Sequence, residues 1–231
     1  MPKLSKRVQA NQALKPKEAL AASEAVAALR KFKGPKFDQT VNLCMHLGLD
    51  TKQADQNLRG SVSLPRGIGK SKRVVAFCGA DVAPKALEAG AVKAGGEELV
   101  AEIEKGWMDF DVAVASPDMM RVVSKLGKVL GPKGLMPSPK AGTVSTNVPE
   151  AVKEYSAGKV EYRTDKGGNI HAVIGKMSFD DAALVENLEY FVNTIERSRP
   201  SSAKGQYIKS ITVSGAMTPG VQIKVAQAVP A

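Results

Sequence analysis

Cysteine and histidine are scarce in this chain of 231 residues, which contains two of each. Cys44 and Cys78 have no CxxC spacing, and only His46 lies near the first, so we predict neither a disulfide framework nor a zinc site. Two buried thiols are expected instead. His46 and His171 fall in predicted strands without a nucleophile signature nearby, so no catalytic residue is predicted.

Long apolar runs are also missing. No stretch approaches the roughly 18 to 20 apolar residues of a membrane span, and no apolar segment of a secretory signal follows the basic N-terminus. No basic tract has the apolar face of a membrane-surface helix. We therefore expect a cytoplasmic protein without a membrane partner.

Aromatic residues number only eleven, six Phe, four Tyr and one Trp. No strand shows the Lys/Arg-Gly-Phe/Tyr-Gly/Ala-Phe pattern of an RNA-recognition motif. A protein that stacks successive bases of a single strand needs more exposed rings. The composition therefore favours folded RNA, recognised through its shape, its backbone and a few base edges.

Carboxylates are absent from four long tracts, residues 1–17, 56–80, 119–149 and 197–231. Each tract holds five Lys or Arg, so twenty of the 33 basic residues occupy tracts without an acid, in a chain of net charge +10. A surface made only for solubility usually intersperses both signs. The distribution favours contact with a polyanion such as nucleic acid, with a merely soluble surface as the alternative.

The third tract contains a segment that we call the basic loop, residues 124–145, "SKLGKVLGPKGLMPSPKAGTVS". Its four glycines allow close backbone approach to a ligand, its three prolines stiffen it, and its four lysines supply charge. Phosphate contact is one interpretation and a rigid structural connection is the other. The candidate contact residues are Lys125, Lys128, Lys133 and Lys140.

Hydrophobic periodicity divides the chain into two styles. Alternating strands are predicted at residues 40–47, 61–64, 159–164, 169–176, 206–213 and 221–225, and helices at 15–36 and 179–199, with Pro16 in the first helical position. Residues 165–168, Asp-Lys-Gly-Gly, have the composition of a hairpin turn. These segments predict an α+β domain with an antiparallel sheet.

Residues 73–158 have the other style, that of a small α/β domain. Continuous apolar runs at 73–78 and 110–116 predict buried parallel strands, and helices are predicted at 79–96, 97–106 and 117–131. Asn147 and Glu150 have the spacing of a helix capping box.

The first 65 or so residues supply too few elements to bury a core alone, so we pair them with the C-terminal part. The predicted architecture is a discontinuous α+β domain, residues 1–66 and 159–231, interrupted by a three-layer, Rossmann-like α/β domain, residues 67–158. The crossings predict a hinge at Gly67, Gly69 and Gly158.

Nucleotide binding has little support. "GIGKS", residues 67–71, ends like a phosphate loop, but the pattern requires glycine where Leu64 stands and must follow a strand and open a helix. No G-x-G-x-x-G follows the strand at 73–78. We predict no cofactor and no metal, and keep as the alternative an α/β enzyme acting on a phosphorylated small molecule.

Five segments resemble the bacterial-type ribosomal protein L1 family, the universal stalk protein family of the large subunit. They are "KFDQTV", "DQNLRGSVSLPRGIGK", "MMRVVSKLGKVLGPKGLMPSPKAGTVS", "YRTDKGGNIHAVIGK" and "AKGQYIKSITVSGAM", and the likeness extends over nearly the whole chain. The resemblance implies two domains with the first interrupted by the second, and a monomer when free. It also implies binding of the discontinuous domain to large-subunit ribosomal RNA at a mobile stalk. Further implied roles are help in releasing deacylated transfer RNA from the exit site and repression through the leader of its own messenger RNA.

The resemblance also implies which residues face RNA: Lys36, Phe37, Thr40, Asp165, Lys166, His171, Ser210, Ser214, Met217 and Thr218. The family usually reads Thr-Met-Gly where this chain reads Ala216-Met217-Thr218. Ala216 lacks a hydroxyl, and Thr218 replaces a residue of free backbone shape. We expect a cost of about 1 kcal/mol per lost hydrogen bond unless the Ser214 or Thr218 hydroxyl substitutes.

Overall fold

The computed structural model describes residues 4–225, so Lys3 of the first basic tract lies outside the described residues. The chain divides into two compact units, residues 1–69 with 162–231, and residues 70–161. Each unit mixes helices and strands, which confirms the predicted mixed α and β content. Within residues 4–225 no helix combines the length and the apolar composition that crossing a bilayer requires.

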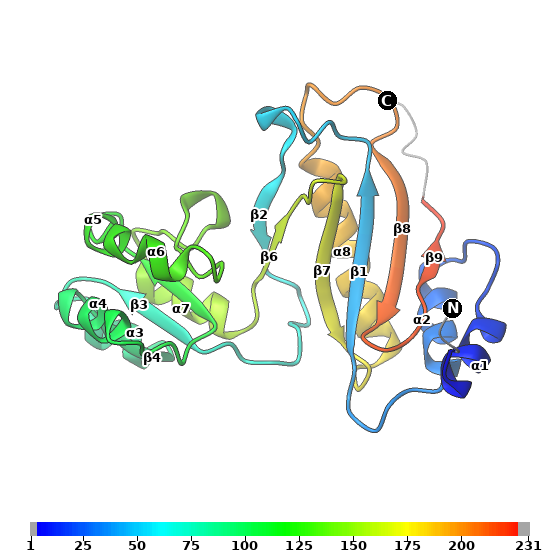
Figure 1. Cartoon of the computed structure of the whole chain (residues 1–231), viewed down its shortest axis with the longest axis horizontal. Helices are drawn as coiled ribbons and strands as arrows, with labels where there is room; N and C mark the ends of the chain where they lie inside the picture. The colour runs from blue at the N-terminus through cyan, green and yellow to red at the C-terminus, as the bar shows by residue number, and fades with distance from the viewer. Residues whose placement is uncertain (1–3, 226–231) are drawn as a thin grey trace. The chain divides into compact units, whose positions relative to one another are not determined.

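The first unit is built on a four-stranded antiparallel sheet of order β7-β1-β8-β9 (Figure 1). The strands are β1 (Thr40–Leu47), β7 (Asn169–Lys176), β8 (Ile208–Gly215) and β9 (Val221–Ile223). They confirm the alternating strands predicted in these regions. β1 lies between β7 and β8 and pairs with both along nearly its whole length.

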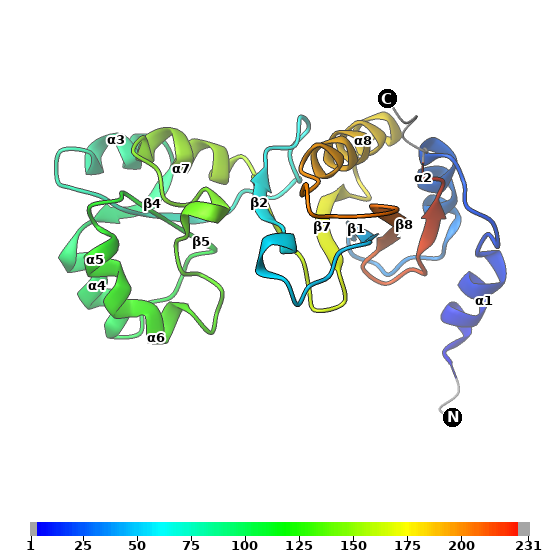
Figure 2. The ribbon, with the colours of Figure 1, turned by 90° about the horizontal axis from the view of Figure 1, so that it is seen from above.

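Two helices cover one face of this sheet, α2 (Ala22–Lys31) and α8 (Asp181–Arg197) (Figures 1 and 2). Burial alternates along β1, and its fully buried side chains are Val41, Leu43, Met45 and Leu47. Leu29 of α2 and Phe191 of α8 are also fully buried. Burying side chains of this size contributes roughly 1.5 to 3 kcal/mol each, so the helix-covered face holds the core of the unit.

The N-terminal helix prediction was wrong in its start. Residues 16–21 are not helical, and a separate helix, α1 (Lys6–Leu14), precedes them. The reason is tertiary, because the Leu20 N–H donates to the Gln222 carbonyl (3.0 Å) and the Lys224 N–H donates to the Leu20 carbonyl (2.8 Å). Leu20 therefore pairs with β9 and cannot supply its backbone groups to a helix.

The second unit contains a parallel sheet of order β4-β3-β5, formed by β3 (Val74–Phe77), β4 (Ala91–Gly95) and β5 (Val112–Ala115). β3 and β5 are buried at every position, as continuous apolar runs predict. Apolar side chains fill both faces of the sheet.

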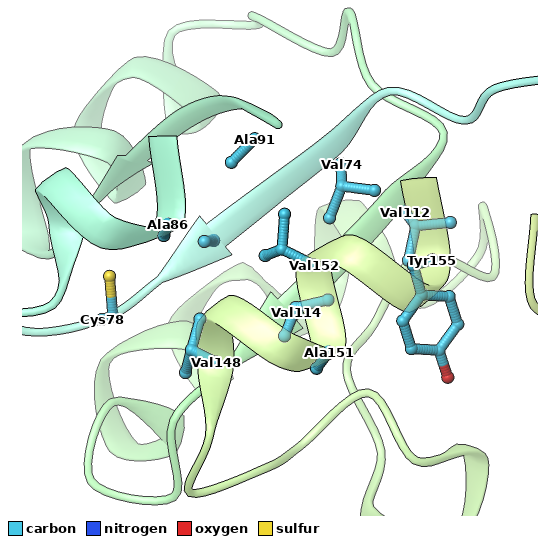
Figure 3. Close-up of a cluster of buried hydrophobic side chains, with 11 residues drawn as sticks. Val74, Cys78, Ala86, Ala91, Val112, Val114, Val148, Ala151, Val152 and Tyr155 are labelled. Carbon is cyan, nitrogen blue, oxygen red and sulfur yellow. The ribbon is translucent and has the colours of Figure 1, made fainter. Parts of the chain in front are cut away.

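Figure 3 shows the cluster on one face, where β3 and β5 meet α3 (Ala83–Glu88) and α7 (Val148–Ser156). The cluster on the other face holds side chains of α4 (Glu97–Glu104) and of the segment that follows β5. That segment consists of α5 (Met120–Val123), η2 (Ser124–Leu126) and α6 (Gly127–Leu130).

Three local predictions in this unit were wrong. Residues 79–96 are not one helix, because Gly90 takes a left-handed conformation (φ 104°) after α3 and the chain continues as β4. The helix predicted at 117–131 is divided by the turn of 3-10 helix at η2. Asn147 does not cap α7 through its side chain, which donates to the Glu150 carboxylate instead (2.7 Å).

The strand predicted at 61–64 lies slightly earlier, as β2 (Arg59–Val62), after the short η1 (Ala54–Gln56). β2 pairs with β6 (Val160–Arg163) in a two-stranded sheet. β6 still leads into the predicted hairpin turn, with an isolated bridge between Thr164 and Ile170. The hairpin turn is therefore present, while the main partner of β6 is β2.

The two segments through which the chain enters and leaves residues 70–161 are hydrogen-bonded to each other. The Lys72 ammonium donates to the Lys159 carbonyl (2.7 Å). Lys72 is partly buried, and this desolvation lowers its pKa from the ordinary value. The ends of the second unit are thus held side by side by a residue of that unit.

Asn187 of α8 is fully buried and joins three backbone groups of the first unit. Its side-chain oxygen accepts from the Arg66 N–H (3.0 Å), and its NH2 group donates to the carbonyls of Gly67 (3.0 Å) and Ile174 (2.8 Å). Removing one partner of a buried hydrogen bond leaves the other with its full desolvation cost. Asn187 therefore links α8 to β7 and to the chain after β2 through buried hydrogen bonds.

We expect Asn187→Ala to lower the free energy of unfolding of the first unit by about 2 kcal/mol or more. In urea the far-UV circular dichroism midpoint should fall by about 1 M. Trp107, the single tryptophan, lies in the second unit and reports on that unit alone. Its fluorescence midpoint should stay at the wild-type value, and an equal shift of both signals would contradict the assignment.

Candidate nucleic-acid interface

The sheet face opposite α2 and α8 carries no described α-helix over it (Figure 1). We call it the open face. It consists of Thr40, Asn42, Cys44 and His46 of β1, Asn169, His171 and Val173 of β7, Ser210, Thr212 and Ser214 of β8, and Gln222 of β9. These side chains are half-buried or exposed, and none is a carboxylate.

Strand register arranges the open face in rows. His46 lies between Asn169 and Ser210, Cys44 between His171 and Thr212, and Asn42 between Val173 and Ser214. Gln222 extends the second row beyond Thr212. Eight residues of β1 at about 3.3 Å each make the face about 25 Å long. The rows present hydroxyl, amide and imidazole groups, which can each donate or accept hydrogen bonds.

One end of the open face is formed by the chain before β1 and the turn after β8. The buried Gln39 joins them, because its side-chain oxygen accepts from the Met217 N–H (2.9 Å) and its carbonyl accepts from the Met177 N–H (2.8 Å). Phe37 is 55% exposed and Met217 is 53% exposed at this end. Two large apolar side chains thus stand in solvent beside a polar face.

The turn at Gly215 to Thr218 shows what the departure from the family pattern does. Thr218 has a negative φ, and its hydroxyl oxygen accepts a hydrogen bond from the Gly215 N–H (2.9 Å). The Thr218 N–H in turn donates to the Gly215 carbonyl (3.2 Å). Threonine therefore fits the turn without backbone strain and closes it, while its hydroxyl hydrogen can still be donated.

The opposite end of the open face is the turn at residues 165–168. The Asp165 carboxylate accepts from the N–H groups of Gly167 and Asn169 (2.8 Å each) and from the Asn169 side-chain NH2 (3.1 Å). These bonds, from Asn169 first, lower the pKa of Asp165 to about 2. The carboxylate remains charged at neutral pH and holds the turn in shape.

Both histidines of the chain are connected to this turn. Nε2 of His171 lies 3.5 Å from the Asp165 carboxylate, and Nδ1 of His46 lies 2.8 Å from the Asn169 side-chain oxygen. The Thr51 hydroxyl donates to the Lys166 carbonyl (2.9 Å). Asp165 and Asn169 thereby orient two imidazoles toward the open face.

The thiols only partly match their prediction. Cys78 is buried, but Cys44 is half-buried and belongs to the open face. Burial raises the pKa of both thiols, and the nearby Asp165 carboxylate adds to the effect at Cys44. The period-two pattern of β1 had already put Cys44 opposite the apolar positions. Among residues 4–225 no three His, Cys, Asp or Glu side chains are placed to hold a metal ion.

The structure distributes the predicted RNA-facing residues between the two ends and the middle of the open face. One end has Lys36, Phe37, Thr40, Ser214, Met217 and Thr218; the turn at the other end has Asp165 and Lys166; His171 and Ser210 lie in between. The prediction omitted Asn42, His46, Asn169, Thr212 and Gln222. The alternation of polar side chains along these strands was the signal that could have identified them.

The basic loop belongs to the second unit and is fixed at its base. The Tyr155 hydroxyl donates to the Ala141 carbonyl in η3 (Pro139–Ala141) (2.6 Å), and the Thr143 hydroxyl oxygen accepts from the Ser138 N–H (2.8 Å). Gly134 and Gly142 have φ of 71° and 73°. Hydrogen bonds and turns thus give the loop a defined conformation. Its four lysines, Lys125, Lys128, Lys133 and Lys140, are exposed.

Most of the basic tracts keep their charge uncompensated. Among their described members only Arg66 and Arg73 form ion pairs, Arg66 with Glu186 and Arg73 with Asp109 and Asp111. The four lysines of the basic loop have no ion-pair partner among residues 4–225. Charge left unpaired within the chain is available to a polyanion.

The glycines predicted as a hinge all have left-handed backbone, with φ of 62° at Gly67, 71° at Gly69 and 103° at Gly158. Gly67 is fixed by Asn187, and a Cβ at Gly69 would lie 2.7 Å from the Phe179 ring. Gly158 follows α7, and its N–H donates to the Tyr155 carbonyl (3.1 Å). Their glycine identity follows from local backbone shape and close packing, and the hinge stays a prediction.

The enzyme alternative gains no specific observation. Residues 67–71, "GIGKS", lie in a segment without regular structure before β3, so they do not join a strand to a helix as a phosphate loop does. His46 and His171 are held by amide and carboxylate groups of the turn. Ser210 and Cys44 are their cross-strand neighbours, but within residues 4–225 neither is hydrogen-bonded to an imidazole.

A basic chain with an open polar sheet face and a loop of unpaired lysines has the features of a protein that contacts a polyanion. The comparison with protein families agrees. The model of the ribosomal protein L1p/L10e family matches residues 29–219, and the chain belongs to this family. It is therefore a structural ribosomal protein, as the five matching segments predicted.

The pKa of Asp165 gives a test of the turn. An unfolded aspartate has a pKa near 3.9, and the folded pKa of Asp165 is about 2. The charged carboxylate therefore contributes its full stabilisation only above a pH of about 3.9. The contribution is lost as the pH falls through about 2. We expect the stability difference between wild type and Asp165→Asn, measured by urea unfolding, to be largest near pH 5 and to shrink toward pH 2. A difference independent of pH would show that the charge plays no part.

Proposed function

We propose that this protein binds large-subunit ribosomal RNA at the mobile stalk near the transfer RNA exit site, through the open face and the loops at its two ends. The observation that carries the proposal is the open face itself: carboxylate-free rows of half-buried and exposed groups, most of which can form hydrogen bonds, on a chain of net charge +10. Family membership supports the ribosomal partner.

In this proposal the α+β domain comprises residues 1–66 and 159–231, and it reads the RNA. The second, three-layer Rossmann-like α/β domain comprises residues 67–158. The compact units 1–69 with 162–231 and 70–161 support this division. Gly67, Gly69 and Gly158 mark the proposed hinge. The free protein is proposed to be a monomer in the cytoplasm that assembles onto the ribosome.

The two ends of the open face have different chemistry and therefore different proposed tasks. Phe37 and Met217 offer apolar surface that can stack on an unpaired base. The middle rows and the turn at Asp165 offer hydrogen bonds to sugars, phosphates and base edges. This mixture suits folded RNA with an exposed loop or bulge better than a regular duplex.

Two further roles complete the proposal. The exposed lysines of the basic loop are proposed to contact transfer RNA in the exit site or the stalk, and so to help release deacylated transfer RNA. The leader of the protein's own messenger RNA is proposed to present the ribosomal binding site a second time. The open face would bind it and repress translation of that messenger RNA.

Titration of the full chain with an RNA fragment carrying the stalk tests the main proposal. A protein making 6 to 10 phosphate contacts loses roughly 1,000-fold or more in affinity between about 50 and 200 mM salt. We expect this loss together with a preference for the fragment over unrelated duplex. Equal binding to both RNAs would show only a generic polyanion surface.

Phe37→Ala should weaken binding of the same fragment by about 5-fold to 150-fold, because stacking on a base contributes roughly 1 to 3 kcal/mol. Tyr190→Ala is the matched control, since Tyr190 is 48% exposed on α8 at the opposite face of the sheet. The control should bind like the wild type. In a translation assay with the messenger RNA leader, Phe37→Ala should lose repression and Tyr190→Ala should keep it.

Lys133→Ala combined with Lys140→Ala tests the division of tasks. Both lysines are exposed in the basic loop of the second unit. The double variant should keep its affinity for the stalk fragment within about 2-fold and bind transfer RNA more weakly, because charge contacts are lost only there. A large loss of stalk affinity would place the basic loop in the ribosomal RNA interface instead.

A further inference from the structure

The N-terminal helix α1 has no part in the hydrophobic core of its unit. Among the described residues of the helix only Asn11 is buried, and Leu14 is 58% exposed. A cavity lined by Leu14, Leu20 and Ala28 lies between the end of α1 and α2. A helix that is polar all round gains little from burial. Its position must therefore be explained by something other than core packing.

Two backbone anchors hold α1 in place. The Asn11 side chain is 1% exposed; it donates to the Lys33 carbonyl (3.0 Å) and accepts from the Lys33 N–H (2.9 Å). The chain after α1 is fixed at the edge of the sheet through the pairing of Leu20 with β9. A polar helix is thus fastened at both its middle and its exit.

These anchors direct α1 to one side. In Figure 2, α2 and α8 lie on one side of the sheet, whereas α1 extends from the β9 edge toward the side that carries the open face. Asn11 also brings α1 next to the segment that leads from α2 to β1, which carries the exposed Lys33, Lys36 and Phe37. The helix therefore continues the proposed RNA-binding surface beyond β9.

The charged residues of α1 and of the chain after it to Lys17 have one sign. Residues 1–17 contain no acid, and none of Lys6, Arg7, Lys15 and Lys17 forms an ion pair within residues 4–225. Lys6, Lys15 and Lys17 are exposed. The helix also lies outside residues 29–219, which the family model matches. Its role is thus not given by family membership.

We propose that α1 and the chain that follows it to Lys17 form a docked phosphate-binding arm, which contacts the backbone of the RNA strand where it leaves the open face at the β9 edge. The proposal rests on the proposed RNA-binding function of that face. The arm adds affinity without reading sequence, because its groups are charges on flexible side chains. Its fixed position distinguishes it from a loose basic tail.

The test uses the full chain, the stalk fragment and a series of salt concentrations. The triple variant Lys6→Gln, Lys15→Gln, Lys17→Gln removes three exposed charges. Only Lys6 lies in α1, where glutamine has nearly the same helix propensity as lysine. The slope of log affinity against log salt should fall by about 2, since each lost phosphate contact lowers it by roughly 0.7 to 0.9. Affinity at about 100 mM salt should fall about 10-fold or more.

The matched control is Lys85→Gln, Lys105→Gln, Lys153→Gln, which removes three exposed charges from the second unit. It should keep the wild-type slope. If both triple variants change the slope equally, net charge rather than the position of α1 is responsible, and the proposal fails. If the α1 variant keeps the wild-type slope and affinity, the proposal also fails.

Asn11→Ala separates docking from charge, because it keeps every lysine and removes the anchor to Lys33. Its melting temperature is measured first to confirm that the unit remains folded. The variant should lose about as much affinity for the stalk fragment as the triple variant does. If it binds with wild-type affinity, docking is not needed and the proposal of a docked arm fails. Absence of any preference of the wild type for the stalk fragment would instead refute the proposed function.

Discussion

The period of two along β1 is the constraint on which the first unit depends. β1 is paired on both sides, so each residue from Val41 to His46 has a fixed neighbour on β7 and on β8. Its odd-numbered positions from 41 to 47 enter the core and its even-numbered ones form the open face. A slip of one residue would exchange the two sets, placing His46 under α8 and Leu43 in solvent. Core burial therefore fixes the arrangement of the polar rows.

The polar groups that shape the interface are also those that hold the fold at its ends. Asp165 closes the hairpin turn and faces His171, and Gln39 fastens the turn that carries Met217. Asn11 and Asn187 do the same for α1 and for the chain after β2. Short polar side chains with two or more hydrogen bonds position loops that apolar packing cannot reach. Local hydrogen bonds therefore hold the two ends of the open face in place.

Elements with a regular hydrophobic period could be predicted from the sequence. Element boundaries that depend on hydrogen bonds to residues far away in the chain could not. The strands of the large sheet, helix α8 and the turn at residues 165–168 follow from periodicity and turn composition, and their presence is confirmed. Helix α2 starts late because Leu20 bonds to β9, and β4 was hidden in an alanine-rich segment that resembles a helix. The residues at both ends of the site came from family resemblance. Asn42, Asn169 and Thr212 required only the strand pattern, and the anchoring role of Asn11 required the structure.

The bond between Lys72 and Lys159 has a consequence for how the chain folds. The contact between His46 and Asn169 spans 123 residues of sequence, and the bond from Lys72 to Lys159 spans 87 of them. Once residues 70–161 have folded, the loop that β1 and β7 must close is shortened to about 36 residues, which reduces the entropy cost of closure by about 1 kcal/mol. The folded inserted unit thereby brings together two segments that are far apart in the sequence. Because synthesis starts at the N-terminus, residues 70–161 are complete before β7, its hairpin and α8 emerge.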